Sequence, residues 1–333
     1  MQFYSMQTTA DRATLELREA AIPEPGPQQV LVQMRAAGLN RGEFIVGHGL
    51  QKAGTAKAIG MEGAGEVVKL GAGVATLKPG QRVMGRCAGA FAEYALMDSR
   101  EAIPIPAKLS WEEAAAIPLT FMVVYDMLVT QGRLASGEWV LVTGVSSGVG
   151  VAALQAAKVL GAKVIGTSGS QDKLDRLTML GLDLGLCTRA SDFYDAVMKA
   201  TGGKGVDLVV NAVGGSMFAE CVRSMAFEGR LATVGYVDGV LKSEIDIQAL
   251  HVKRLTLFGV SNKMRSAEQR AAAVPGFIAD LLPAIAAGRI RSVIDKVYPF
   301  DQLAAAKAYM ESNRHLGKIV LAMPASTPGK EKS

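Results

Sequence analysis

Apolar and polar positions alternate in the first third of the chain, and this alternation predicts β-strands that are buried on one face. The clearest run is 29–36 (QVLVQMRA), and residues 63–70 and 81–84 repeat the pattern. Glycine- and proline-rich segments separate these runs, which is typical of turns. The short strands and turns together predict a compact, partly open β-barrel.

From about residue 110 the pattern changes to continuous apolar runs that alternate with helical periodicity. A helix start is expected at Ser110, which two glutamates follow at 112 and 113. Apolar runs of this kind are buried on both faces, as in a parallel sheet between two layers of helices. We therefore expect an α/β, doubly wound Rossmann sheet. Its expected strands are 139–143, 162–166, 207–213, 230–234 and 255–260, and its first helices are 149–161 and 172–180.

The alternation stops near residue 290, and two further strands are expected at 293–299 and 318–322 (KIVLA). They would rejoin the first region. The expected organisation is a barrel-type catalytic domain made of 1–118 and 286–333, and a nucleotide-binding domain made of 119–285. The last ten residues, 324–333, are expected to form a loose polar tail.

Composition narrows the class of protein. The 333 residues are 49% hydrophobic and 20% charged, as in an ordinary globular protein. The net charge of +5 is spread along the chain and aromatic residues make up only 6%, so no nucleic-acid partner is expected. The three cysteines include no C-x-x-C pair, which argues against a disulfide framework and a zinc knuckle.

The first residues lack the apolar segment of a secretory signal, and the most apolar window, 114–129, is too short to span a bilayer. We expect a cytoplasmic protein without a membrane partner.

The strongest local signal is a glycine-rich turn between the strand 139–143 and the helix that follows. Its spacing is G-x-x-x-G-x-G. Such a turn lets backbone N–H groups approach a pyrophosphate, whose charge the helix N-terminus stabilises. The alternative is a plain tight strand–helix turn. The candidate cofactor-binding residues here are Gly144, Ser146, Ser147, Gly148, Val149 and Gly150.

The end of the second strand indicates which dinucleotide binds. An NAD site usually carries Asp or Glu there to bond the ribose 2′-hydroxyl. Residues 166–170 (GTSGS) hold no carboxylate, and the first one is Asp172. A 2′-phosphate would instead find the hydroxyls of Ser168 and Ser170, with Lys173 and Arg189 as candidate cations. The pattern favours NADPH, although each cation alone could be an ordinary surface charge.

Several motifs occur in an order that resembles the medium-chain dehydrogenase/reductase superfamily, in its zinc-independent quinone oxidoreductase (zeta-crystallin-like) branch. The resemblance spans nearly the whole chain and implies a GroES-like barrel beside the Rossmann domain. The motifs are 25–32 (PGPQQVLV), 38–41 (GLNR), 60–68 (GMEGAGEVV), 78–83 (KPGQRV), 89–94 (GAFAEY), 148–150 (GVG) and 317–321 (GKIVL).

The resemblance also implies that no metal is bound. Zinc-dependent relatives carry Cys where this chain has Asn40 and His where it has Met61, and a further Cys near residues 118–119 is absent. Glu62 alone is too few ligands for a catalytic zinc. Without a Lewis acid, we expect hydride transfer to a quinone or to an α,β-unsaturated carbonyl, whose own oxygen takes up the developing charge.

By resemblance, Asn40 would face the substrate and donate to the developing oxyanion, and Arg41 is a weaker candidate for the same task. Fixing the turn is an equally open role for Asn40. Several relatives carry a Tyr shortly after this turn, whereas 43–46 (EFIV) has none, so a water could supply the proton. Further cofactor contacts implied by resemblance are Thr120, Thr167, Asn211, Val213, Gly235, Tyr236, Val260, Ser261, Asn313 and Lys318.

The expected function is therefore that of an NADPH-dependent quinone or enone reductase. Two alternatives stay open: an enoyl-thioester reductase of the same fold, and an NADPH-binding protein without turnover, as in family members that serve as lens proteins or bind single-stranded RNA. His48, His251 and His315 match no catalytic spacing. The strand 255–260 is expected to end its sheet, and pairing of this open edge across a two-fold axis predicts a homodimer.

Overall fold

The fold is that of a computed structural model, which describes residues 1–8, 13–44 and 56–324. Most of the predicted tail and His48 lie outside these ranges. The chain divides into two compact units, one of Met1–Leu119, Ser266–Val274 and Ile294–Ser333, the other of Thr120–Arg265 and Pro275–Val293. The sequence-based division had placed all of 119–285 in the nucleotide-binding part. In the structure Ser266–Val274 belongs to the first unit, where Arg270 forms an ion pair of 2.9 Å with Glu101. Residues 286–293, which were expected in the barrel-type part, belong to the second unit.

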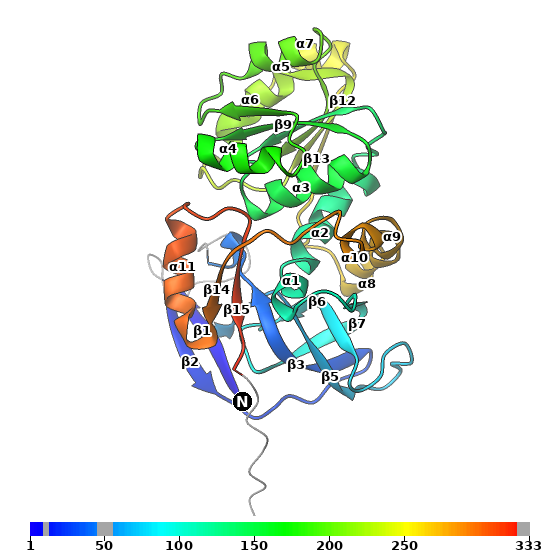
Figure 1. The fold of residues 1–333 in the computed structure, drawn as a ribbon, viewed down its shortest axis with the longest axis vertical. Helices are drawn as coiled ribbons and strands as arrows, with labels where there is room; N and C mark the ends of the chain where they lie inside the picture. The colour runs from blue at the N-terminus through cyan, green and yellow to red at the C-terminus, as the bar shows by residue number, and fades with distance from the viewer. Residues whose placement is uncertain (9–12, 45–55, 325–333) are drawn as a thin grey trace, which may run out of the picture. The chain divides into compact units, whose positions relative to one another are not determined.

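The second unit contains the predicted Rossmann sheet, whose six strands are all parallel. Helices α3 and α4 lie on one face of the sheet, and α5 and α6 lie on the other (Figure 1). The doubly wound prediction is confirmed. In spatial order the strands are β10 (Leu184–Cys187), β9 (Lys163–Ser168), β8 (Trp139–Thr143), β11 (Val206–Asn211), β12 (Met225–Thr233) and β13 (Thr256–Gly259). The helices are α3 (Gly148–Val159), α4 (Gln171–Thr178), α5 (Tyr194–Ala200), α6 (Gly215–Arg223) and α7 (Ile247–Val252).

The apolar strands explain this architecture. Val140, Leu141 and Val142 of β8 are buried, as are Leu208, Val209 and Val210 of β11. Side chains of successive residues point to opposite faces, so a strand buried throughout needs a helix layer on each side.

The first unit contains the predicted barrel. Strand β3 (Gln29–Gly38) pairs with both β5 and β7, so the four strands β3, β5, β6 and β7 close on one another. Strands β15 and β14 extend the sheet beside β3, and β1, β2 and β4 form a separate three-stranded sheet. The remaining bounds are β1 (Gln2–Thr8), β2 (Ala13–Glu19), β4 (Ala56–Ala58), β5 (Glu62–Leu70), β6 (Arg82–Ala88), β7 (Tyr94–Pro104), β14 (Ile294–Pro299) and β15 (Lys318–Ala322).

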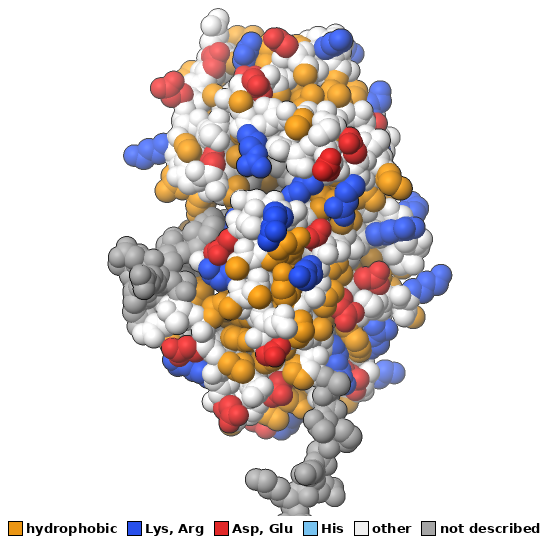
Figure 2. All heavy atoms as spheres, turned by 60° about the vertical axis from the view of Figure 1, so that its left-hand side comes forward, with side chains coloured by type: hydrophobic (Ala, Val, Ile, Leu, Met, Phe, Trp, Pro, Cys, Tyr) orange, Lys and Arg blue, Asp and Glu red, His pale blue; other side chains and the backbone are white. Residues whose placement is uncertain are grey.

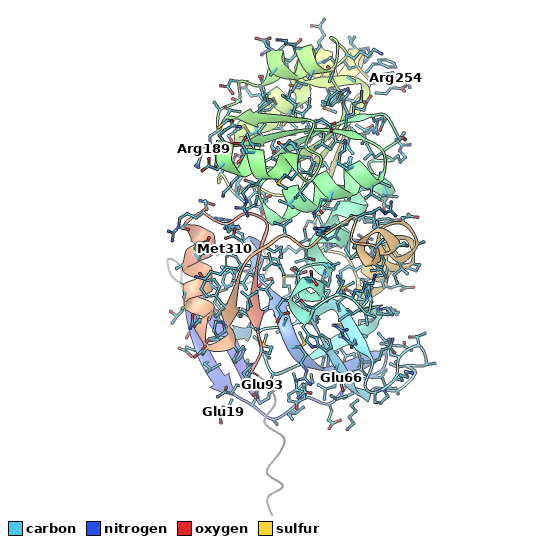
Figure 3. The ribbon with its side chains drawn as sticks, viewed as in Figure 1. Glu19, Glu66, Glu93, Arg189, Arg254 and Met310 are labelled. Atoms are coloured by element: carbon cyan, nitrogen blue, oxygen red, sulfur yellow. The ribbon has the colours of Figure 1, made fainter. Side chains whose placement is uncertain are left out.

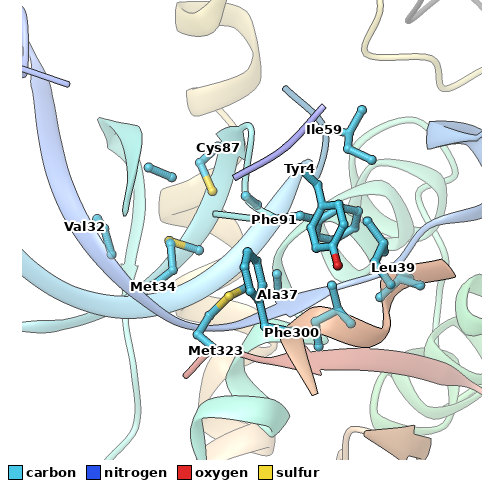
Figure 4. Close-up of a cluster of buried hydrophobic side chains, with 14 of the residues drawn as sticks. Tyr4, Val32, Met34, Ala37, Leu39, Ile59, Cys87, Phe91, Phe300 and Met323 are labelled. Carbon is cyan, nitrogen blue, oxygen red and sulfur yellow. The ribbon is translucent and has the colours of Figure 1, made fainter. Parts of the chain in front are cut away.

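An apolar core holds these strands together. Tyr4 meets Phe300 edge to face at 5.2 Å between ring centroids, and Met34, Phe91 and Met323 belong to the same buried cluster (Figure 4). The strands thereby gain a packed interior that fixes the ends of β3 and β15, where the site described below is built.

Short helices connect these sheets. The predicted helix start at Ser110 is a capping box in which the Ser110 hydroxyl accepts from the Glu113 N–H. Helix α2 continues into a π-helical turn, Asp126–Thr130. The bounds are α1 (Trp111–Ala115), α2 (Pro118–Tyr125), α8 (Ala267–Ala271), α9 (Val274–Asp280), α10 (Leu282–Ala286) and α11 (Leu303–Glu311), with a 3-10 turn at Arg41–Glu43.

Two surface properties bear on partners. Over the part of the chain that the structure describes, no helix has the length and apolar character needed to cross a membrane. On the face shown in Figure 2, lysine and arginine side chains are interspersed with aspartate and glutamate.

Candidate functional site

The carboxyl ends of the parallel strands meet at one edge of the second unit. Thr143 of β8, Asn211 of β11, Thr233 of β12 and Gly259 of β13 are neighbours in register. The glycine-rich turn, Val213, Gly235–Tyr236 and Val260–Ser261 follow these ends directly. The topology thus brings residues from distant parts of the sequence to the edge where ligands of open α/β sheets bind.

The glycine-rich turn is shaped to expose the N-terminus of α3. Gly144 has a φ of 64°, and its N–H donates to the Thr167 hydroxyl at 3.2 Å. The Ser147 hydroxyl caps the helix by accepting from the Gly150 N–H at 3.1 Å. A Cβ on Gly150 would lie 2.5 Å from the Gly144 carbonyl oxygen, so only glycine lets α3 begin this close to β8. The arrangement suits a pyrophosphate at the helix N-terminus.

The turn after β9 presents hydroxyls and a cation. The Ser146 and Ser168 hydroxyl oxygens lie 3.1 Å apart. Arg189, which follows β10, is exposed (Figure 3). It packs directly over Gly169, where a Cβ would come within 2.6 Å of the arginine Cγ. Ser170 instead caps α4 by accepting from the half-buried Lys173's backbone N–H at 3.4 Å. This donor set fits the 2′-phosphate of NADP(H) and offers no carboxylate to a free 2′-hydroxyl.

Asn211 is buried, and its side chain holds the turn after β11. Its Oδ1 accepts from the Thr143 hydroxyl at 3.0 Å and from the Gly214 N–H at 3.1 Å, while its Nδ2 donates to the Gly214 carbonyl at 2.9 Å. Its amide is therefore engaged in shaping the loop that carries Val213. A contact between Asn211 and a cofactor stays a prediction.

Asp238 was not identified from the sequence. Its carboxylate accepts from the Ser216 N–H at 2.9 Å and hydroxyl at 2.6 Å, and from the Val240 N–H at 3.0 Å. Burial alone would raise the pKa of Asp238, but these hydrogen bonds outweigh burial and lower it. The ionised carboxylate ties the loop after β12 to the start of α6. The role of Asp238 depends on its hydrogen bonds to Ser216, 22 residues earlier, and no local pattern in the sequence indicates such a contact.

The other predicted cofactor contacts are distributed as follows. Thr120 is buried on α2, Val213 and Gly235 are half-buried, Val260 is buried, and Tyr236 and Ser261 are exposed. Asn313 and Lys318 belong to the first unit.

A polar cluster lies in the first unit at the end of β3, in which Asn40 is half-buried and the other members are buried. It consists of Asn40, Glu43, Glu62 and Lys318, and we call it the Asn40 cluster. Lys318 Nζ donates to the Leu39 carbonyl at 2.9 Å, to Asn40 Oδ1 at 2.8 Å and to Glu62 Oε1 at 2.7 Å. Asn40 Nδ2 donates to Glu43 Oε1 and to Glu62 Oε1, each at 2.9 Å.

Glu43 differs from Glu62 in its electrostatics. Burial raises the pKa of Glu43 to about 8, and the nearby Glu62 acts in the same direction, against the opposing influence of Asn40 and Lys318. Glu62 accepts a third bond, from the Leu119 N–H at 2.8 Å. At neutral pH the cluster therefore holds the protonated carboxyl group of Glu43 beside the ion pair that Lys318 forms with Glu62.

Arg41 points away from this cluster and binds the end of α11. Its Nη2 donates to the Met310 carbonyl at 2.8 Å and to Asn313 Oδ1 at 2.6 Å. Burial lowers the pKa of Arg41, with Glu311 opposing the shift. The contacts satisfy carbonyl groups at the C-terminus of a helix, where a cation is favoured. The proposed anion-stabilising role of Arg41 and the cofactor contact of Asn313 remain predictions.

The donor set at Asn40 does not fit a catalytic zinc. Zinc in such sites takes three protein ligands from Cys, His and carboxylates. Here an ammonium already binds Glu62 Oε1, and the neighbouring donors are an amide and a protonated carboxyl. Among the described residues no three His, Cys, Asp or Glu side chains are grouped as metal ligands.

Comparison with known proteins agrees with this architecture. Residues 26–107 match the model of the alcohol dehydrogenase GroES-like domain, and residues 148–274 match that of the zinc-binding dehydrogenases. The spectinabilin polyketide synthase system protein NorB of Streptomyces orinoci is 35% identical over 95% of this chain, which spans only 14% of that protein. The human synaptic vesicle membrane protein VAT-1 homolog is 30% identical over 97% of this chain and 84% of its own length.

Solved structures are similar over the whole chain. A mycobacterial protein complexed with NADPH has 25% identity and a TM-score of 0.86, and the CurK enoyl reductase has 25% and 0.85. An NAD-dependent alcohol dehydrogenase has 30% and 0.82. Each match covers 97% of this chain and 100% of the other. The chain therefore belongs to the medium-chain dehydrogenase/reductase family of oxidoreductases.

Proposed function

We propose that this chain is an NADPH-dependent reductase that transfers a hydride to a quinone or to an α,β-unsaturated carbonyl without a metal ion. The observation that carries the proposal is the turn after β9. It lacks a carboxylate, it packs the guanidinium of Arg189 against Gly169, and it follows Ser168, whose hydroxyl lies 3.1 Å from that of Ser146. A doubly charged 2′-phosphate is attracted by this arrangement, whereas a 2′-hydroxyl gains little from it.

The chain's own residues would hold the cofactor at three places. The backbone of the turn at Gly144–Gly150 and the N-terminus of α3 face the pyrophosphate, and Ser168 and Arg189 bind the 2′-phosphate. Residues after β11, β12 and β13 line the same edge of the sheet. When bound, NADPH supplies the hydride, and the protein contributes orientation and electrostatics.

The choice of acceptor follows from the Asn40 cluster. The side chains of this cluster do not form a binding site for a Lewis-acidic metal ion that would polarise an alcohol. An acceptor that delocalises charge onto its own carbonyl oxygen is therefore favoured. Asn40 would hold that oxygen, provided one of its two amide hydrogens is released from Glu43 or Glu62. The proton that completes the reduction would come from water.

An enoyl-thioester reductase is the second candidate. It is favoured by the similarity to the CurK enoyl reductase and to a polyketide synthase system protein. Such an enzyme reduces the same conjugated C=C bond but carries its substrate on a thioester. The third candidate, an NADPH-binding protein without turnover, stays open because the Tyr that several relatives carry is missing.

A titration followed by a turnover assay separates these candidates. Purified protein should bind NADPH more tightly than NADH, measured by nicotinamide fluorescence. NADPH oxidation should then be recorded with a quinone, an enal and an enoyl thioester at equal concentrations. Oxidation by the free quinone or enal supports the proposal, and a preference for the thioester supports the second candidate. Binding without oxidation by any acceptor supports the third.

We propose further that the chain forms a homodimer through β13 and works in the cytoplasm. β13 is the edge strand of its sheet, with β12 on one side. Ile247 and Val252 on the adjacent helix α7 are exposed apolar residues that a second copy would cover. All three cysteines are free thiols, as in a reducing compartment.

A further inference from the structure

Lys318 was expected to contact the cofactor, yet its ammonium lies inside the Asn40 cluster. We propose that this ammonium is a built-in cation which neutralises Glu62 and fixes the side-chain amide of Asn40 in one orientation. Lys318 and Glu62 would then be positioning residues for the turn that carries Asn40. The part of this inference that concerns turnover rests on the proposed function.

The first argument is that every hydrogen of the ammonium is used. Its three acceptors are the Leu39 carbonyl, Asn40 Oδ1 and Glu62 Oε1, at 2.7–2.9 Å. An ammonium has three donors and no acceptor, so none remains for a phosphate or a ribose. A cofactor contact would require Lys318 to give up one of these bonds.

The second argument concerns the two ends of the Asn40 amide. The oxygen faces the ammonium, and the NH₂ group faces the carboxyl oxygens of Glu43 and Glu62. Turning the amide over would place NH₂ against an ammonium and an oxygen against a carboxylate. Both contacts are repulsive, so the charges around Asn40 specify a single orientation.

The third argument is burial. Glu62 is 0% exposed and Lys318 is 6% exposed. A buried carboxylate without a counter-charge is strongly unfavourable, and here the counter-charge is supplied by Lys318. With Glu43 protonated, which its raised pKa favours, the cluster has no net charge at neutral pH. A second cation is not needed to balance it.

The pairings of β3 with β15 and with β5 place Lys318 and Glu62 next to Asn40. Lys318 is the first residue of β15, which runs antiparallel to β3 with Val320 opposite Gly38. The pairing places the Lys318 side chain beside Leu39 and Asn40. A Cβ on Gly38 would lie 2.7 Å from Glu62 Oε1 and 2.7 Å from the Ala115 carbonyl oxygen. Glycine at position 38 therefore leaves the space that the Glu62 carboxylate occupies.

The first experiment removes the cation and returns it from solution. In Lys318→Ala we expect a lower thermal midpoint and a turnover number reduced about 10- to 100-fold, as for residues that orient a reacting group. Ethylammonium, which carries three N–H donors, should restore both. Tetramethylammonium, which is charged but has no N–H, should restore neither. Lys296→Ala, which removes an exposed lysine from the neighbouring strand β14, is the matched control and should respond to neither amine.

Equal rescue by both amines, or no rescue by ethylammonium, would overturn the role of the three hydrogen bonds. NADPH affinity supplies an independent readout. If Lys318 acts only on Asn40, the dissociation constant of NADPH for Lys318→Ala stays within about twofold of the wild-type value. A tenfold weaker NADPH complex would instead favour a direct cofactor contact and contradict the inference.

The second experiment guards against simple loss of folding. The double variant Glu62→Gln/Lys318→Met replaces the buried ion pair by neutral side chains of similar size, which proteins often tolerate. We expect it to regain the thermal midpoint but not the turnover number, because the two charges that specify one orientation of the Asn40 amide are then gone, although Glu43 can still accept from Asn40 Nδ2. If the double variant regained both, the pair would be merely structural. If none of the tested acceptors supports NADPH oxidation by the wild-type protein, the proposed function fails. Rescue of the thermal midpoint of Lys318→Ala by ethylammonium then still tests the role of the cation.

Discussion

The side chain of Arg189 packs over Gly169, leaving no room for a Cβ between β9 and the segment after β10. The glycine thus allows a guanidinium to lie directly over the turn that follows β9. We expect Arg189→Ala to weaken NADPH binding about 10- to 100-fold, the loss of roughly 1.5–3 kcal/mol from a hydrogen bond to a charged group. NADH binding should change less than twofold. Fluorescence titration with both cofactors measures the difference.

Arg176→Ala is the control for this variant, because it removes an exposed arginine from α4 of the same unit. Gly169→Ala should reproduce part of the Arg189→Ala effect by displacing the guanidinium without removing it. If Arg189→Ala weakened NADPH and NADH equally, the charge of Arg189 would not distinguish the two cofactors.

The cap of α3 allows stability and cofactor binding to be separated. Ser147→Ala removes the acceptor of the Gly150 N–H and should cost about 1 kcal/mol of unfolding free energy, a fall of roughly 2–4 °C in thermal midpoint. Ser147→Asp keeps a capping oxygen and should restore the midpoint. Its negative charge, however, lies where a pyrophosphate is expected, so NADPH should bind at least about tenfold more weakly.

Differential scanning calorimetry and fluorescence titration of the same three proteins provide the two readouts. Tight NADPH binding by Ser147→Asp would place the pyrophosphate elsewhere. A fall in both properties would show only that aspartate is not accommodated in this turn.

The edge strand β13 offers a test of self-association. Thr256 is exposed on this strand. A lysine on a strand edge opposes pairing with another edge, so Thr256→Lys should shift the protein from dimer to monomer in sedimentation velocity. Met179→Lys makes the same change of charge at an exposed position next to α4 and should leave the dimer intact. A wild-type protein that sediments as a monomer at micromolar concentration would contradict the dimer.

The second unit was predictable because its signals are local. Residues 139–143 were predicted as a buried strand and form β8 with these bounds, and the predicted edge strand 255–260 contains β13. A continuous apolar run restricts where its strand can lie in the fold, since such a strand is stable only between two layers of helices. Strands β1 and β2 were not singled out, although 13–19 (ATLELRE) alternates apolar and polar residues, because the alternation is short and its leucines are only partly buried or exposed.

The Asn40 cluster could not be found in the same way. Lys318 is 256 residues from Glu62 and 278 residues from Asn40, and only the pairing of β15 with β3 brings them together. In the sequence analysis Glu43 entered only as part of residues 43–46, which lack the Tyr that several relatives carry after the active-site turn. Glu43 is buried because it lies in the 3-10 turn Arg41–Glu43. A turn this short has no periodic pattern of hydrophobic residues from which it could be predicted.

Glu43 should make stability depend on pH. Its pKa is about 8 in the folded protein, against 4.5 for the exposed group, with burial as the main cause. Between these values the folded state holds a proton that the unfolded state has lost, so stability falls as the pH rises from about 4.5 to about 8. The slope due to this group is at most about 1.4 kcal/mol per pH unit.

Glu43→Gln keeps an oxygen that can accept from Asn40 Nδ2 and removes the titration. We therefore expect the variant to lose this part of the decline, so that its free energy of unfolding rises relative to that of the wild type between pH 6 and pH 8. The groups that face Glu43, namely Asn40, Glu62 and Lys318, are unchanged in the variant. Urea unfolding at half-unit pH steps measures the two profiles. Parallel profiles would mean that Glu43 is ionised in the folded protein, because burial would then not be holding its proton.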